Sequence, residues 1–190
     1  MVNKNRTNSK YKLQNKKLIL YLLLLIYLIG MVTGCVFTFK NKDNIEFIKQ
    51  ISLTEKLLAN GESAISVNTA KIFIRDAILL VSILIFKYSG ILKSCCICVP
   101  FILSLQNSCL YSVMINTGEI SIFNLLFNYI AKDTAVSLLI LMYCFIVTNE
   151  IVHKRNNPQK DIKKLSIYFS GLSVIYILNI LIKIITLPLQ

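Results

Sequence analysis

An uninterrupted apolar run near the N-terminus limits most strongly how this chain can fold. Leu18 to Phe39 is a stretch of 22 residues without a charged side chain. About 20 apolar residues are enough for a helix to cross the hydrocarbon core of a bilayer. A segment inside a bilayer must satisfy its own backbone hydrogen bonds, which a helix does. The run therefore predicts a membrane-spanning helix at residues 18–39.

A cleaved signal sequence is the competing interpretation of this run. The apolar part of a secretory signal has about 7–15 residues and ends at a small-residue cleavage site. This run is longer, and "GMVTGCVF" contains no A-x-A pattern. A lipoprotein signal would have a leucine shortly before the cysteine, where this chain has Met31 and Val32 ahead of Cys35. We therefore expect an uncleaved anchor, preceded by a basic cytoplasmic tail at residues 1–17.

Composition and charge point to the same environment. Hydrophobic residues make up 55% of the chain and charged residues 16%, whereas a soluble protein has about 25% charged residues. This excludes a disordered chain and an ordinary water-soluble enzyme. The net charge of +12 could indicate nucleic-acid binding, but cytoplasmic loops of membrane proteins are also rich in Lys and Arg. We expect the lipid bilayer as partner and no nucleic acid.

Four further apolar blocks follow an intervening mixed segment at residues 40–71. They lie at about residues 72–92, 94–115, 123–148 and 165–187. Pro100 falls inside the third block, and a proline is tolerated there when a neighbour satisfies the freed carbonyl. The pattern predicts an all-α integral membrane protein with five transmembrane helices, of which the last four form a membrane domain at residues 72–187.

The distribution of basic residues predicts the orientation. With the N-terminus inside, 13 Lys and Arg residues fall on the cytoplasmic side and six fall outside. This agrees with the positive-inside rule. We expect a multi-pass protein of the cell membrane with a cytoplasmic N-terminus and an extracytoplasmic C-terminus.

The extracytoplasmic segment contains apolar residues at near-helical spacing, among them Ile48, Ile51 and Leu57. This spacing is typical of an amphipathic helix that lies on a membrane or on a neighbouring helix. A partly ordered loop is the other interpretation. If the helix forms, its apolar face is a candidate surface for contact with a partner.

Two basic–acidic pairs interrupt the apolar blocks. Arg75-Asp76 lies in "FIRDAILLVSILIF" and Lys132-Asp133 lies in "IAKDTAVSLLILMYCF". The likeness indicates either an internal duplication of a helical hairpin or chance similarity between apolar helices. An intramembrane charge is a functional candidate because it is costly to insert. Alternatively, the basic side chains reach the interface and the aspartates stay hydrated there.

Gly30 and Gly34 form a G-x-x-x-G motif in the first apolar run. Glycines at this spacing allow two transmembrane helices to approach closely. We expect them to pack against another helix, with unconstrained glycines in a lipid-facing helix as the alternative.

A search for catalytic and metal-binding patterns finds none. The chain lacks H-E-x-x-H, G-x-S-x-G and a phosphate-binding glycine loop. The cluster Cys95-Cys96-x-Cys98 has no second pair for zinc, and His153, the only histidine, falls in a polar loop. We expect reduced cysteines that behave as small apolar residues, no catalytic residue, no cofactor and no metal.

The layout resembles the stage II sporulation protein M family, a bacterial family of five-span membrane proteins. The resemblance lies in "LLLLIYLIGMVTGCVF", in "FIRDAILLVSILIF", in "CVPFILSLQNSCLYSVMI" with its early proline, and in "LIKIITLPLQ" with Pro188. It covers nearly the whole chain, mostly as topology. The chain departs from the family at Gln106, Asn107 and Tyr111, where members usually have Lys-Gly and a further glycine.

The resemblance implies a scaffold and not an enzyme. Members of the family sit in the septal membrane of a sporulating cell and hold a complex of cell-wall hydrolases during engulfment. Two other functions compete with this one: a small transporter or permease subunit that uses Asp76 and Asp133, and an immunity protein against membrane-active peptides. A scaffold predicts that the aspartates can be neutralised without loss of function, and a transporter predicts the reverse.

Overall fold

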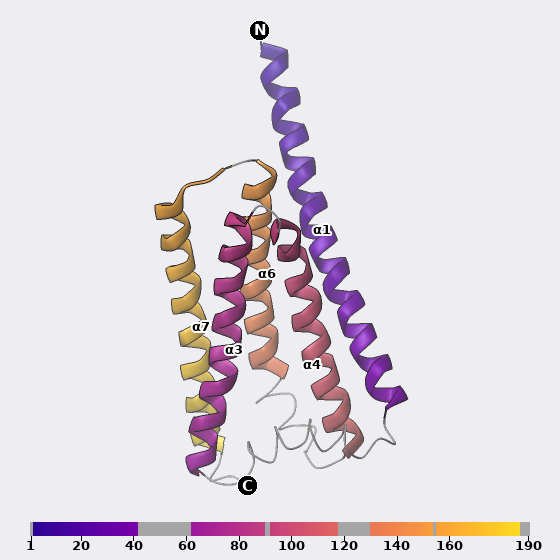
Figure 1. Cartoon of the computed structure of the whole chain (residues 1–190), viewed down its shortest axis with the longest axis vertical. Coiled ribbons are helices and arrows are strands. Elements are labelled where there is room, and N and C mark those ends of the chain that lie inside the picture. Colours follow the sequence, from indigo (N-terminus) through magenta and orange to yellow (C-terminus); the bar gives the residue numbers. More distant parts are fainter. Residues whose placement is uncertain (1, 42–61, 90–91, 118–129, 154, 187–190) are drawn as a thin grey trace.

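The computed structural model describes residues 2–41, 62–89, 92–117, 130–153 and 155–186. Within these ranges the chain is helical and contains no strand, which confirms the predicted all-α class there. The elements in chain order are α1 (Val2–Lys40), α3 (Glu62–Tyr88), the 3₁₀ helix η1 (Leu92–Ile97), α4 (Cys98–Thr117), α6 (Ala131–Val152) and α7 (Pro158–Thr186) (Figure 1).

Four stretches of these helices are long and apolar enough to cross a membrane. They are Asn15–Lys40, Leu92–Val113, Ala131–Val152 and Pro158–Ile182. The chain is therefore a helical protein of the membrane. Helix α3 is the fifth long helix, and it packs against α6 and α7 within the same bundle.

Helix α1 lies outside the other helices and packs mainly along α4. It begins at Val2, so the basic segment predicted as a tail continues the same helix as the apolar run. Figure 1 shows this N-terminal part projecting beyond the remaining helices. Helix α1 thus combines a membrane-crossing part with a basic helical extension.

The core lies between α3, α4, α6 and α7, and Ile19 and Leu23 of α1 are also buried in it. Leu80, Ile83, Leu103, Ile140 and Leu172 have no exposed surface. Apolar residues on the opposite faces, such as Ile78 and Leu138, are more than half exposed. Lipid tails solvate apolar side chains as well as a protein interior does, so these outward faces are compatible with a bilayer.

The connection between α6 and α7 is shorter than the sequence indicates. The polar run at residues 149–164 resembles a loop, but α6 continues to Val152 and α7 begins at Pro158. Asn157 caps α7, since its side-chain Oδ1 accepts a hydrogen bond from the Lys160 amide at 3.1 Å. Proline at the first helical position suits this start because its missing amide hydrogen has no partner there in any case. His153 ends α6 and is half-buried, where the sequence indicated a loop residue.

Pro100 lies near the start of α4, and a neighbouring helix repairs its effect. In a continuous α-helix the amide of residue 100 would donate to the Cys96 carbonyl, and proline lacks this amide. The Cys144 thiol of α6 donates to that carbonyl at 3.5 Å. Two buried cysteines thereby contribute to the contact between η1 and α6.

Candidate functional site

The two glycines of the G-x-x-x-G motif lie where α1 meets α4. A Cβ atom built on Gly30 would come within 2.0 Å of the Ser104 hydroxyl and 2.6 Å of the Phe101 carbonyl oxygen. A Cβ on Gly34 would come within 2.0 Å of the Ser108 hydroxyl and 2.7 Å of the Leu105 carbonyl oxygen. The two backbones are therefore closer than any side chain larger than glycine allows.

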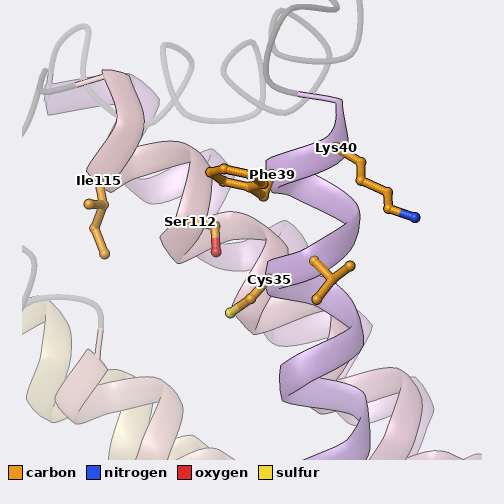
Figure 2. A pocket seen from close by; sticks show the side chains of 6 residues that line it. Cys35, Phe39, Lys40, Ser112 and Ile115 are labelled. Carbon is orange, nitrogen blue, oxygen red and sulfur yellow. The ribbon is translucent and has the colours of Figure 1, made fainter.

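A pocket of about 450 Å³ lies between α1 and α4, beyond this contact. Its lining residues are Cys35, Val36, Phe39, Lys40, Ser112 and Ile115. Figure 2 shows Cys35 and Phe39 directed from α1 toward α4, whereas Lys40 points away from them. The described lining residues are largely apolar, and Lys40 is the charged residue among them.

The structure brings Arg75, Asp76, Lys132 and Asp133 into one network. Arg75 contacts Asp76 Oδ1 through Nε at 2.9 Å and through Nη2 at 2.8 Å. Lys132 pairs with Asp133 Oδ1 at 2.8 Å. Each aspartate thus neutralises the basic residue that precedes it in the sequence.

Two tyrosines complete this network and connect its two pairs. The Tyr176 hydroxyl donates to Asp76 Oδ2 at 2.6 Å, and the Tyr111 hydroxyl donates to Asp133 Oδ2 at 2.7 Å. The Lys132 ammonium also lies 5.3 Å from the centre of the Tyr176 ring. We call these six residues the aspartate cluster: Arg75, Asp76, Tyr111, Lys132, Asp133 and Tyr176. The cluster joins α3, α4, α6 and α7 and carries no net charge.

Burial in the aspartate cluster distinguishes the acids from the guanidinium. The Asp76 side chain is 0% exposed and that of Asp133 is 6% exposed, whereas that of Arg75 is 38% exposed. The two carboxylates agree with the first interpretation of the sequence, in which the charges are buried. The partly exposed Arg75 agrees with the second, in which a basic side chain reaches toward the interface. Buried charges of this kind are stable only when they are paired.

A second ionic network lies at the C-terminal end of α3, whereas Asp76 lies near the middle of that helix. The buried Lys87 ammonium contacts Asp161 Oδ2 at 2.5 Å and Glu150 Oε2 at 2.7 Å. Tyr88 donates to the same Asp161 oxygen at 2.5 Å. Lys164 pairs with Glu150 and lies 3.6 Å from Asp161 Oδ1. We call this the Lys87 cluster: Lys87, Tyr88, Glu150, Asp161 and Lys164. It joins α3, α6 and α7, and its charges also cancel.

Sequence reasoning missed the Lys87 cluster and both tyrosines of the aspartate cluster. Lys87, Glu150 and Asp161 lie where the apolar blocks meet polar residues, a position typical of solvated helix ends. Tyr111 and Tyr176 look like ordinary apolar-run residues. No pattern in the sequence singles out either tyrosine.

The remaining sequence-based candidates are the apolar residues of the 40–71 segment, the cysteines and possible metal ligands. Ile48, Ile51 and Leu57 lie outside the described residues. All six cysteines are free, with Cys96, Cys109 and Cys144 buried. No group of three or more His, Cys, Asp or Glu side chains with metal-binding geometry occurs within the described ranges.

No family model, curated protein or solved structure matches this chain.

Proposed function

We propose that this chain is a non-catalytic scaffold of the cell membrane with five spans, an internal N-terminus and an external C-terminus. The observation that carries the proposal is the pairing of four acids that are buried or partly buried in the described part of the chain. Asp76, Asp133, Glu150 and Asp161 all bind basic side chains of the chain itself. Asp76 and Asp133 are joined to other helices through Tyr176 and Tyr111, and Lys87 joins α3 to Glu150 and Asp161. These links between helices support a structural role.

A transport site makes a different demand on such acids. A carboxylate that carries ions or protons through a membrane must exchange its partner and communicate with a water-filled path. Asp76 and Asp133 each accept a tyrosine hydroxyl and pair with a basic residue at hydrogen-bond distance. Both of their oxygens are occupied, which favours a fixed network over a binding site for ions.

Helix α3 serves as the fifth span in this proposal. It packs beside α6 and α7, and its buried Lys87 is neutralised by Glu150 and Asp161. Neutralisation removes most of the cost of placing a lysine near the membrane. The orientation follows from the excess of basic residues on the cytoplasmic side.

The partner that we propose is a complex of membrane-anchored cell-wall hydrolases at the septal membrane during engulfment. Support comes from the resemblance to the stage II sporulation protein M family. The apolar residues Ile48, Ile51 and Leu57 are the proposed contact face. Replacing all three with Ser should abolish recovery of hydrolases with the protein, whereas replacing the lipid-facing Ile78, Leu138 and Met142 with Ala should not.

Deletion of the gene tests the proposal. Starved cells are stained with a membrane dye, and the engulfing membrane is followed by microscopy. We expect arrest of engulfment, restored by the wild-type gene, and co-purification of a peptidoglycan hydrolase with the tagged protein. Normal engulfment together with no recovered hydrolase would exclude this function.

A transporter or permease subunit is the second candidate, and one observation favours it. A pocket of about 200 Å³ between α6 and α7 is lined in part by Lys132, a member of the aspartate cluster. A substrate in this pocket would contact a cation beside a buried acid. Uptake of labelled ions or solutes by vesicles containing the purified protein distinguishes this candidate from the scaffold.

A further inference from the structure

The tyrosine–aspartate hydrogen bonds of the aspartate cluster are reciprocal. Asp76 of α3 accepts from Tyr176 of α7, and Asp133 of α6 accepts from Tyr111 of α4. Helices α3 and α4 are consecutive and form one hairpin, in which α3 packs against η1 at the start of α4, and α6 and α7 pack against each other as the second hairpin. Each hairpin therefore provides an aspartate from its first helix and a tyrosine from its second, and each bond crosses to the other hairpin.

The first helices of the two hairpins also match in register. In α3 and α6 a basic residue precedes the aspartate, and the positions four, seven and eleven residues after it are buried in both helices. These positions are Leu80, Ile83 and Lys87 in α3, and Ser137, Ile140 and Cys144 in α6. Helix α6 buries further positions beside these, such as Val136 and Leu141, so the two helices share one buried stripe that is wider in α6.

The directions of the helices agree with this match. Figure 1 shows α3 and α6 running one way through the bundle, and α4 and α7 returning the other way. The two hairpins therefore have the same orientation. Repeats of this kind are related by an axis along the membrane normal.

We infer that α3–α4 and α6–α7 are two copies of one helical hairpin, and that their exchanged tyrosine–aspartate bonds form a lock between the hairpins at the aspartate cluster. The lock has two equivalent halves because each bond has the same donor, acceptor and charge partner type. The Lys87 cluster joins α3 to α6 and α7 at the C-terminal end of α3. Breaking both tyrosine bonds should let the hairpins separate near the aspartate cluster alone.

Distance measurement between spin labels in the full chain tests the lock. One pair of labels, on genetically encoded residues, replaces Ile78 and Leu138, which are exposed and lie near the aspartate cluster. A second pair replaces Ile85 and Val152, which are exposed and lie toward the Lys87 cluster. The protein is held in nanodiscs of phosphatidylethanolamine and phosphatidylglycerol. The variants are Tyr111→Phe, Tyr176→Phe and the double variant.

We expect the 78–138 distance to broaden and lengthen in the double variant, on the order of the 1–2 Å seen for shifts at helix interfaces. Each single variant should give a smaller change, similar for the two tyrosines, and the 85–152 distance should stay constant. Tyr143→Phe is the matched control, because the buried Tyr143 hydroxyl has no hydrogen-bond partner among the described residues.

Three results would overturn the inference. They are an unchanged 78–138 distance in the double variant, an equal shift at both label pairs, and an effect confined to one of the two tyrosines. If the double variant cannot be recovered from membranes, the 78–138 and 85–152 distances in the two single variants are compared in the same way. Uptake and engulfment are not read out, so failure of the lock is distinguishable from failure of the proposed scaffold.

Discussion

The hydroxyl of Tyr176 donates to Oδ2 of Asp76 at 2.6 Å, between residues that are 100 positions apart in the sequence. We predict that Tyr176→Phe lowers the free energy of unfolding by about 1.5–3 kcal/mol, the range for a hydrogen bond to a charged group. In an Asp76→Asn background, Tyr176→Phe should lower the free energy of unfolding by much less, because the charged acceptor is absent. Reversible unfolding in detergent measures this cycle, and equal effects in both backgrounds would show that the bond contributes nothing.

The contact between α1 and α4 should not tolerate even one added methyl group. Gly34→Ala places a Cβ against the Leu105 backbone oxygen and the Ser108 hydroxyl, so we predict that α1 moves away from α4 and that the melting temperature falls. Gly171→Ala is the matched control. Its Cβ would meet the Leu139 Cδ1 atom at 2.9 Å, and a flexible side chain can move aside. Equal melting temperatures for the two variants would show that the close approach of α1 and α4 is not needed.

Lys87 should be the most costly lysine in the described part of the chain to replace. Lys87→Met leaves Glu150 and Asp161 with less compensating charge, and breaking a buried ion pair costs about 3–5 kcal/mol. We predict a strong loss of protein recovered in folded form after detergent extraction. Lys93→Met, at an exposed position in η1, should have no such effect. Full recovery of the Lys87 variant would argue against the Lys87 cluster as a stabilising element.

The repair of the carbonyl freed by Pro100 depends on the Cys144 thiol. Cys144→Ala removes the donor and a buried sulfur, and we predict a loss of about 1–3 kcal/mol for the unsatisfied carbonyl. Cys144→Ser retains a donor and should lose less. Thermal unfolding of both variants checks the order, with Cys98→Ala at an exposed cysteine as the control. A serine variant less stable than the alanine variant would contradict the repair.

The helical class and the approximate positions of the helices follow from apolar run length, because the bilayer requires long helices. The ends of the helices could not be predicted from apolar run length. Glu150 and Asp161 look like loop residues, yet Glu150 lies in the last turns of α6 and Asp161 in the first turn of α7. Their partner Lys87 lies more than 60 positions away in the sequence, and residue patterns do not reveal pairings at such a separation.

Some residues of the candidate site could also be predicted from the sequence, and others could not. Gly30, Gly34 and the two basic–acidic pairs stand out in the sequence because glycines at fixed spacing and charges in apolar runs are unusual. The tyrosines that bind Asp76 and Asp133 do not stand out among nine tyrosines. Only the packing of α4 and α7 against α6 and α3 selects Tyr111 and Tyr176 from the others.

In the proposed scaffold, the buried acids hold the helical bundle together and carry no ions. The most direct measurement compares engulfment in cells carrying Asp76→Asn or Asp133→Asn, with expression adjusted until the membrane contains the wild-type amount of protein. The scaffold account predicts normal engulfment at matched abundance, since any defect arises from lost stability alone. Loss of engulfment at matched abundance for both variants would contradict the account and favour the transporter.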